Sequence, residues 1–270
     1  MTAPTAAEFM TAPAPLNGSS AWASRYAVEL RRVIHEHAAQ APRSLQAHLG
    51  PSELGAVCCR QVAAKLAGLP STNHVADPFP SWRGQALHVA AADAFAGDNE
   101  RSGEIRWVVE QRVTPHPDHP GTADLYDARE QACVDHKFLS PTSMGKIRAA
   151  DGPPRHYVVQ LLLYAHGYRL MGLPVKRVVL AAYPAAAGSL DGLWVWEREY
   201  SAADDVLLAE VFAQTKARKQ WAIKLLTGEA TLMDVPATPE DASCYFCSQF
   251  RPQSAHDGGA GCPGHVGKAA

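Results

Sequence analysis

The sequence predicts an α/β fold in which helices flank a short mixed sheet. Apolar residues recur at helical spacing in several segments, whereas in other segments they alternate or cluster as they do in strands. Hydrophobic residues make up 47% of the 270-residue chain, which is enough to bury one sizeable core. The composition therefore excludes a disordered or fibrous protein.

The predicted elements follow one another along the whole chain. Helical periodicity indicates helices over residues 21–48 (one long or broken helix), 51–68, 84–95, 157–170 and 202–226. Strand-like runs bounded by Pro, Gly and Asp indicate strands over residues 105–113, 122–126, 131–138, 175–181 and 193–200. Ser52 is expected to cap the second helix, which would carry Cys58 and Cys59.

The chain is expected to consist of four segments. Residues 1–20 are rich in Ala, Pro, Thr and Ser and should form a disordered tail, and residues 21–80 should form an N-terminal helical segment. Residues 81–227 contain the core, and residues 228–270 form a tail rich in Pro, Gly, Ser and Cys. Because this second tail has little hydrophobic periodicity, something other than a core must order it.

Charge and hydropathy narrow the class of protein. Lys and Arg number 25 against 27 Asp and Glu, so no global positive field is available for indiscriminate binding of nucleic acids. Any contact with DNA must therefore use a local patch. The N-terminus lacks the features of a secretory signal, and no stretch reaches the roughly 18 apolar residues of a membrane-spanning helix. We expect a cytoplasmic protein that does not associate with membranes.

Two aspartates and a lysine form the main candidate site. Asp124 and Asp135 lie on consecutive predicted strands, and pairing of these strands as a hairpin would bring both carboxylates onto one face. Lys137 shares that face with Asp135 because side chains alternate along a strand. Adjacent carboxylates repel each other unless a hard cation such as Mg²⁺ binds them, and such an ion can activate water for attack on a phosphate.

A second interpretation of these residues remains open. Asp124 could be a turn residue, and Asp135 could form an exposed ion pair with Lys137 that contributes little to stability. The neighbouring Leu125 and Val134 are apolar, which favours strands packed in a core. A charge cluster without a metal would be costly there.

Four motifs occur in a characteristic order along the chain. They are Gly84-Gln85-Ala86-Leu87-His88, Gly121-Thr122-Ala123-Asp124, Asp135-His136-Lys137 and Gln160-Leu161-Leu162-Leu163-Tyr164. This set resembles the PD-(D/E)XK nucleases, and specifically their RecB-like branch. The resemblance implies a restriction-endonuclease-like fold, with a central mixed sheet flanked by helices, and makes residues 81–227 its nuclease core.

The same resemblance implies roles for individual residues. The ligands of Mg²⁺ or Mn²⁺ would be His88, Asp124 and Asp135. Because His88 would supply an imidazole ligand, Mn²⁺ is more acceptable here than at a site with oxygen ligands alone. Lys137 would be the catalytic lysine. Gln160 and Tyr164 would support the site or contact DNA, since positions i and i+4 share one helical face. Glu110, on the strand before Asp124, is an additional candidate.

The six cysteines form a second chemical feature. They are Cys58, Cys59, Cys133, Cys244, Cys247 and Cys262. In a reducing compartment, closely spaced thiols favour metal ligation over disulfides. RecB-like exonucleases of the iron–sulfur type, which include the fourth CRISPR-associated protein and phage relatives, carry one such cysteine before the nuclease motifs and three after them. The resemblance implies that a 4Fe-4S cluster joins the N- and C-terminal segments through Cys58, Cys244, Cys247 and Cys262.

Two alternatives at the cysteines remain open. Cys59 could serve as the first ligand in place of Cys58. Zn²⁺ could instead be held by a set with ordinary zinc spacing, namely Cys244, Cys247, Cys262 and His265. Cys133 lies in an apolar strand and is expected to be a small buried core residue.

By resemblance, the protein would be a metal-dependent DNA exonuclease that acts on single-stranded DNA or on DNA with free ends. Its setting would be recombination, repair or CRISPR spacer processing, with a recombinase or CRISPR integrase as a possible partner. Candidate DNA contacts on the last predicted helix are Lys216, Arg218, Lys219, Trp221 and Lys224. The alternative is a non-catalytic DNA-binding or adaptor protein that keeps the nuclease fold and has a zinc-stapled tail.

Overall fold

The computed structural model describes residues 20–40, 49–73, 77–150, 152–239 and 244–264. The chain divides into two compact units. The smaller unit is formed by residues 1–46 and 76–83, and the larger by residues 47–75 and 84–270. The tail predicted over residues 1–20 lies outside the described residues except for Ser20, whose hydroxyl accepts a hydrogen bond from the Ala23 amide (3.1 Å).

Helix α1 (Ala21–Gln40) belongs to the smaller unit and matches the start of the helix predicted over residues 21–48. Residues 41–48 lie outside the described part of the chain. None of the α1 residues is buried. Trp22 stacks on Tyr26 one turn later, with ring centroids 4.9 Å apart.

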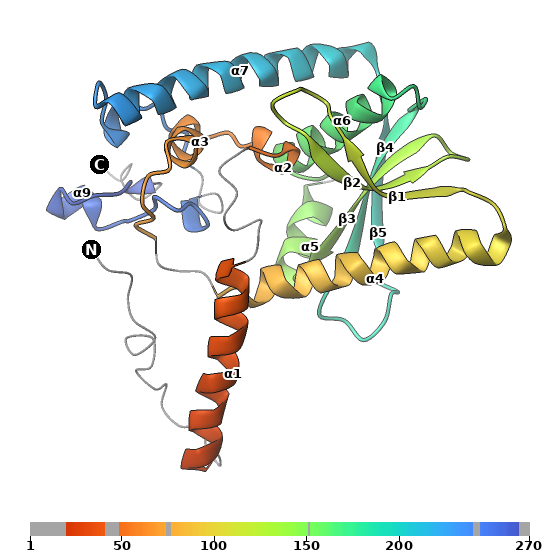
Figure 1. Ribbon diagram of the computed structural model, residues 1–270, viewed down its shortest axis with the longest axis horizontal. Coiled ribbons are helices and arrows are strands. Elements are labelled where there is room, and N and C mark those ends of the chain that lie inside the picture. Colours follow the sequence, from red (N-terminus) through yellow and green to blue (C-terminus); the bar gives the residue numbers. More distant parts are fainter. Residues whose placement is uncertain (1–19, 41–48, 74–76, 151, 240–243, 265–270) are drawn as a thin grey trace. The chain divides into compact units, whose positions relative to one another are not determined.

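The larger unit is built on a five-stranded mixed sheet with the strand order β1-β2-β3-β4-β5. The strands are β1 (Trp107–Val113), β2 (Gly121–Asp127), β3 (Ala132–Leu139), β4 (Arg177–Pro184) and β5 (Trp194–Glu199). Only β3 and β4 are parallel; the other neighbours are antiparallel. The predicted strands and the mixed sheet flanked by helices are confirmed (Figure 1).

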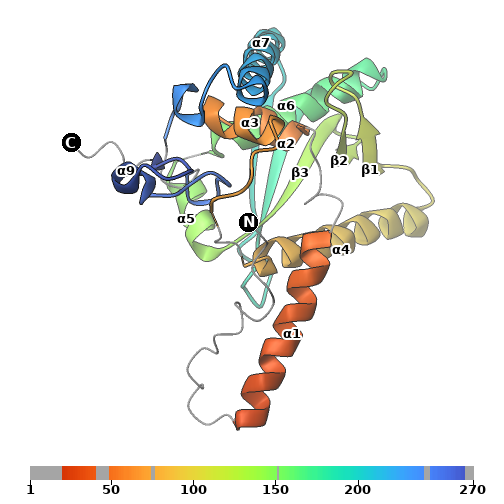
Figure 2. The same ribbon diagram turned by 60° about the vertical axis from the view of Figure 1, so that its left-hand side comes forward.

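Helices lie on both sides of this sheet (Figure 1). Besides α1, the described helices are α2 (Pro51–Leu54), α3 (Cys59–Leu66), α4 (Phe79–Ser102), α5 (Pro141–Ala149), α6 (Arg155–Leu170) and α7 (Ala202–Thr227), followed by the short η2 (Leu232–Asp234) and α9 (Ser254–Asp257). Helix α6 contacts β1 to β4, and α7 packs on α6 and α3. Figures 1 and 2 show α6 and α7 on one side of the sheet and α4 on the other.

The core lies between α6 and the sheet. Helix α6 is buried over Val159 to Ala165 and packs against β2 and β3, where Tyr126 meets Tyr168 with ring centroids 5.0 Å apart. Cys133 is fully buried, and its thiol lies 3.9 Å from the Leu161 carbonyl oxygen. The prediction of Cys133 as a small core residue is confirmed. No helix in the described ranges is long and apolar enough to cross a bilayer.

The helix predicted over residues 51–68 is wrong in two respects. Ser52 is not the cap: Gly50 precedes the first turn, and Pro51 stands at a position where proline is favoured. The segment is also divided into α2 and α3, with Gly55 at the end of α2. A Cβ on Gly55 would lie 2.7 Å from the backbone of His156, so this turn is packed directly against α6. Cys58 consequently precedes α3 as its N-cap rather than lying within a helix.

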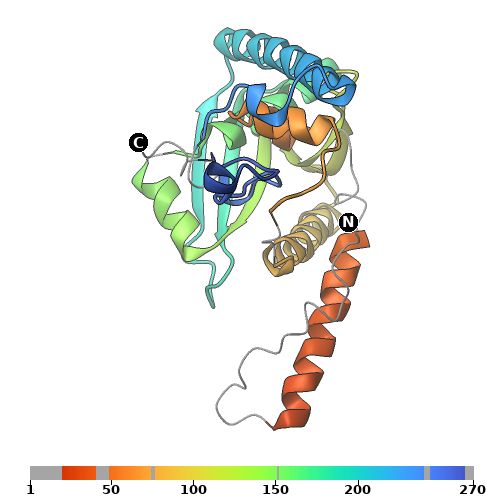
Figure 3. The same cartoon turned by 90° about the vertical axis from the view of Figure 1, so that its left-hand side faces the viewer.

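The C-terminal segment is fastened to residues 69–73 by backbone groups. The Ser248 carbonyl accepts hydrogen bonds from the amides of Thr72 (2.9 Å) and Asn73 (3.0 Å), and the Gln249 side chain donates to the Pro70 carbonyl (3.0 Å). Figure 3 shows this segment beside α3. Hydrogen bonding to a distant part of the chain therefore orders a tail that lacks a core of its own.

Gly121 opens β2 and is packed too closely for any side chain. A Cβ at this position would lie 2.7 Å from the ring of Pro51 and 3.0 Å from the ring of Tyr164. The glycine of the Gly-Thr-Ala-Asp motif thus lets α2 and α6 close over the strand that carries Asp124.

We expect Gly121→Ala to destabilise the protein by about 1–3 kcal/mol, because the added methyl overpacks this contact. Gly145→Ala is the matched control: Gly145 lies in α5 with open space around it, so alanine should stabilise the helix by about 0.5–1 kcal/mol. Urea unfolding of the two variants measures the difference. Equal stability of Gly121→Ala and wild type would contradict this close packing of Pro51 and Tyr164 on Gly121.

Candidate active site

Strand β3 directs alternate side chains to opposite faces of the sheet. Asp135 and Lys137 point toward α6, where the Lys137 ammonium lies 2.6 Å from Asp135 Oδ2 and donates a 3.1 Å hydrogen bond to Gln160 Oε1. His136, between them, points the other way and stacks on Phe95 of α4, with ring centroids 5.3 Å apart. The strand period of two therefore places the carboxylate and the ammonium together.

Asp124 lies where β2 and β3 separate. The antiparallel ladder ends at the pair Leu125 and Val134, so the next position would set Asp124 opposite Asp135. The amide of His136 donates a 2.8 Å hydrogen bond to a side-chain atom, Asp124 Oδ2, rather than to a backbone carbonyl of β2. This carboxylate therefore lies at the open end of the hairpin, on the strand next to the one that carries Asp135.

His88 and Glu110 approach Asp124 from two other elements. His88 Nδ1, on α4, lies 3.6 Å from Asp124 Oδ2, and its ring packs edge-on against Phe138. Glu110 lies on β1 between residues that pair with β2. The potential ligand atoms of His88, Glu110 and Asp124 all lie within 4.8 Å of one another.

Glu110 adopts a backbone conformation that a non-glycine residue rarely takes, with φ of 49°. Such a conformation costs energy and tends to occur where function requires a particular side-chain direction. The sequence identifies Glu110 only as an additional candidate on the strand before Asp124, because the local backbone that brings it close to Asp124 has no sequence signature.

Burial controls the charge of the site. Desolvation, followed by repulsion from Asp135, raises the pKa of Asp124 to about 8. Burial opposes the charge of Lys137, but the two aspartates outweigh it and raise the pKa of the ammonium. Without a bound metal ion, the site therefore keeps its ammonium but disfavours the charged form of Asp124, and a divalent cation would favour that form.

The donor set fits a divalent cation. Asp135 is completely buried, and its Oδ1 has no hydrogen-bond partner in the described part of the chain. A buried carboxylate oxygen without a partner is costly, and a metal ion would satisfy it. Carboxylate oxygens together with one imidazole suit Mg²⁺ or Mn²⁺.

Gln160 and Tyr164 hold the lysine side of this site. The Gln160 amide donates to the Tyr164 hydroxyl (3.4 Å), and its oxygen accepts from Lys137. Tyr157, one turn before Gln160, lies under the ammonium, with its ring centroid 5.0 Å from Lys137 Nζ. Helix α6 thus contributes both a hydrogen-bond acceptor and an aromatic face to the lysine.

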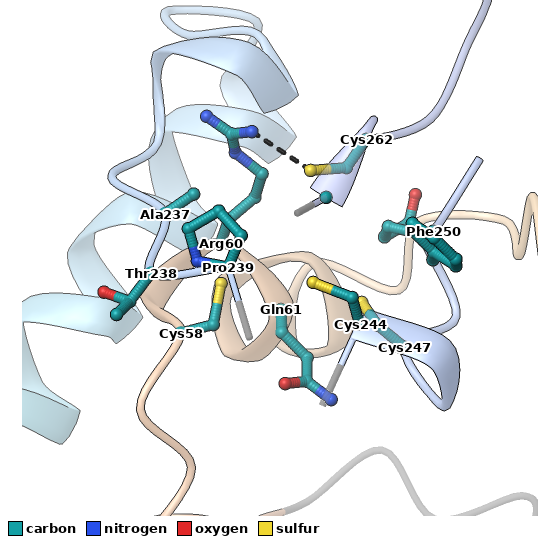
Figure 4. A pocket seen from close by; sticks show the side chains of 12 residues that line it. Cys58, Arg60, Gln61, Ala237, Thr238, Pro239, Cys244, Cys247, Phe250 and Cys262 are labelled. Carbon is teal, nitrogen blue, oxygen red and sulfur yellow. Dashed lines mark hydrogen bonds between the residues drawn. The ribbon is translucent and has the colours of Figure 1, made fainter. Parts of the chain in front are cut away.

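Four cysteines from distant parts of the sequence line one pocket, which also contains Arg60 and Gln61 (Figure 4). They are Cys58, Cys244, Cys247 and Cys262. Cys59 is not among the residues that line it, and His265 lies outside the described residues. Across the described ranges, no three cysteine sulfurs lie within 4.8 Å of one another.

Arg60 ties this pocket together. Its guanidinium donates to the sulfur of Cys262 (3.1 Å) and to the carbonyls of Met233 and Val235 (both 3.0 Å). The Arg60 amide also donates to the Pro236 carbonyl (2.9 Å). One residue of α3 therefore positions the segment that leads into the C-terminal cysteines.

Several basic residues of α7 are less available for contact with DNA than their spacing in the sequence indicates. Arg218 is buried and donates to the carbonyls of Leu54 (3.3 Å) and Ala56 (2.6 Å), so its expected contact with DNA is wrong. Lys219 pairs with Asp118 at 2.7 Å, and Lys224 lies over the ring of Trp221.

The buried pair of Asp135 and Lys137 leads to a stability prediction. In the presence of a chelator, Lys137→Met should lower the free energy of unfolding by about 3–5 kcal/mol, because it leaves the buried Asp135 carboxylate without its cation. Adding Asp135→Asn should recover a large part of that loss. Chemical denaturation of the single and double variants measures this coupling, and additive effects would show that the two side chains do not interact.

Comparison with protein-family models and with curated proteins finds no match for this chain. Among solved structures, the chain is similar to an alkaline exonuclease (LHK-Exo) from Laribacter hongkongensis, with 13% identity and a TM-score of 0.46 over 68% of this chain and 91% of that chain. It is also similar to a phage-related exonuclease from Haemophilus somnus 129PT, with 13% identity and a TM-score of 0.42 over 64% and 82% of the two chains.

Proposed function

We propose that this protein is a metal-dependent nuclease that hydrolyses phosphodiester bonds in DNA. The observation that supports the proposal most strongly is the convergence of two aspartates with a lysine, whose side chains are at most 15% exposed. Asp135 has an unsatisfied carboxylate oxygen, and Asp124 lies on the adjacent strand with His88 and Glu110 close to it. An ordinary structural ion pair needs none of these additional groups.

The ion would be held by carboxylate oxygens of Asp124 and Asp135 and by the imidazole of His88. Glu110 is a further ligand candidate because its carboxylate lies within 4.8 Å of the ligand atoms of His88 and Asp124. A bound divalent ion supplies an activated water and offsets negative charge on the phosphate.

Lys137 would stabilise the negative charge that develops on the phosphate. Its ammonium is held between Asp135 and Gln160 and over Tyr157, so few orientations remain open to it. Because these contacts exist before substrate binds, little reorganisation is required when the ammonium donates to a phosphate oxygen. Gln160 and Tyr164 act as positioning residues for this lysine.

The proposed substrate is DNA that is single-stranded or has free ends. The proposed mode of cleavage is exonucleolytic degradation. Both follow the RecB-like pattern of the four motifs, as does a role in recombination, repair or CRISPR spacer processing beside a recombinase or integrase. A non-catalytic adaptor is the alternative, and it would not require the unsatisfied carboxylate beside the ammonium.

Lys137→Ala should reduce DNA cleavage by about 100-fold or more, the usual effect of removing one preorganised donor from a developing charge. Lys176→Ala, at an exposed lysine before β4, is the matched control and should keep wild-type activity. The assay uses end-labelled single-stranded, linear duplex and closed circular DNA with Mg²⁺, Mn²⁺ or chelator.

The same assay separates the alternatives. Degradation of linear but not circular DNA identifies an exonuclease. Cleavage in chelator, or equal cleavage by wild type and Lys137→Ala, would contradict the mechanism and favour the adaptor.

For the cysteine pocket, we propose a 4Fe-4S cluster held by Cys58, Cys244, Cys247 and Cys262. Four thiolates are the ligand set of such clusters, and four cysteines line one pocket here. The alternative is Zn²⁺ at Cys244, Cys247, Cys262 and His265, of which His265 lies outside the described residues.

Protein purified without oxygen should be brown and contain roughly four iron atoms and four sulfide ions per chain. Cys58→Ser should lose the colour and lower the melting temperature, because the cluster contributes folding energy. Cys59→Ser, one residue away, should keep both properties. Colourless protein with one zinc ion per chain would support the zinc alternative instead.

A further inference from the structure

A cluster of metal-ligating side chains lies apart from the two sites described above, in the loop between β1 and β2. Its members are His116, Asp118 and His119. One potential ligand atom from each of the three lies within 4.8 Å of the other two. The amide of His119 donates to the His116 carbonyl (2.9 Å), so a tight turn brings the two imidazoles to the same place.

His119 is oriented as a ligand would be. It is 3% exposed, and its Nδ1 lies 2.9 Å from the Leu49 carbonyl oxygen. Because a carbonyl can only accept, Nδ1 carries the proton and Nε2 presents a lone pair. Nε2 has no hydrogen-bond partner in the described part of the chain. A backbone carbonyl that fixes the far nitrogen of an imidazole is the usual support of a metal-binding histidine.

The other two members are held only weakly by protein groups. Asp118 Oδ2 pairs with Lys219 at 2.7 Å, but both side chains are exposed, so the pair contributes little to stability. His116 packs against Phe212 of α7 and accepts a long hydrogen bond from the Asp118 amide (3.2 Å). A cation can therefore replace these contacts at small cost.

We propose that His116, Asp118 and His119 form a second metal site, selective for a borderline first-row cation of the zinc type. Two imidazoles and one carboxylate are a donor set found at zinc sites, whereas Mg²⁺ prefers oxygen ligands. The bound ion would fasten the loop between β1 and β2. The bound ion would thereby be connected to two other parts of the larger unit. The loop contacts Phe212 and Lys219 of α7, and it contacts the carbonyl of Leu49, which lies just before α2.

The test adds Co²⁺ or Zn²⁺ to the full-length protein. The protein is used as purified, so that the metal group bound by the cysteine pocket stays in place. Wild type should take up one more equivalent of Co²⁺ than His116→Ala/Asp118→Asn does. The extra Co²⁺ should show visible absorption without a thiolate charge-transfer band, because its ligands are nitrogen and oxygen. Zn²⁺ should raise the melting temperature of wild type more than that of this variant, in which only the nuclease site can still bind the ion.

Two controls keep the result specific. His35→Ala, at an exposed histidine on α1, should bind Co²⁺ as wild type does. Asp118→Asn alone, at an exposed residue, should weaken binding without disturbing the fold.

Mg²⁺-dependent cleavage should be unchanged in His116→Ala, so this site and the nuclease proposal fail independently. Equal Co²⁺ uptake by wild type and the double variant, or absorption that is all thiolate in character, would overturn the proposal.

Discussion

The candidate site of the larger unit depends on the close approach of two carboxylates and one ammonium on the neighbouring strands β2 and β3. Asp135 is completely buried beside Lys137, and the side chain of Asp124 on the neighbouring strand is 13% exposed. Separating these groups from water is expensive, and burial together with Asp135 raises the pKa of Asp124, so its charged form needs a further cation. The cluster therefore fits a site that receives a divalent ion, and the surrounding fold supports its geometry.

That support comes from three places. The β2–β3 ladder stops before Asp124, so a carboxylate rather than a carbonyl receives the His136 amide. Gly121 lets α2 and Tyr164 pack onto the strand that carries Asp124. Helix α6 then supplies Gln160 to Lys137. A local break in the regular strand pairing is thus accompanied by close packing of the adjacent residues.

Much of this arrangement could be predicted from the sequence, because it depends on local periodicity. Alternation along β3 places Asp135 with Lys137 and away from His136, and the apolar run of α6 identifies a central helix. Features that depend on distant contacts could not be predicted. The division of residues 51–68 at Gly55 requires the approach of His156, and the burial of Arg218 requires the carbonyls at the end of α2. Helix α5 was too short for periodicity to reveal, although Ser140 and Pro141 are ordinary start signals.

Anomalous scattering from a crystal soaked in Mn²⁺ would locate the divalent ion. We expect an anomalous peak in contact with Asp124 and Asp135 and next to the His88 imidazole. A well-occupied Mn²⁺ peak elsewhere, with Asp135 still held only by Lys137, would contradict it.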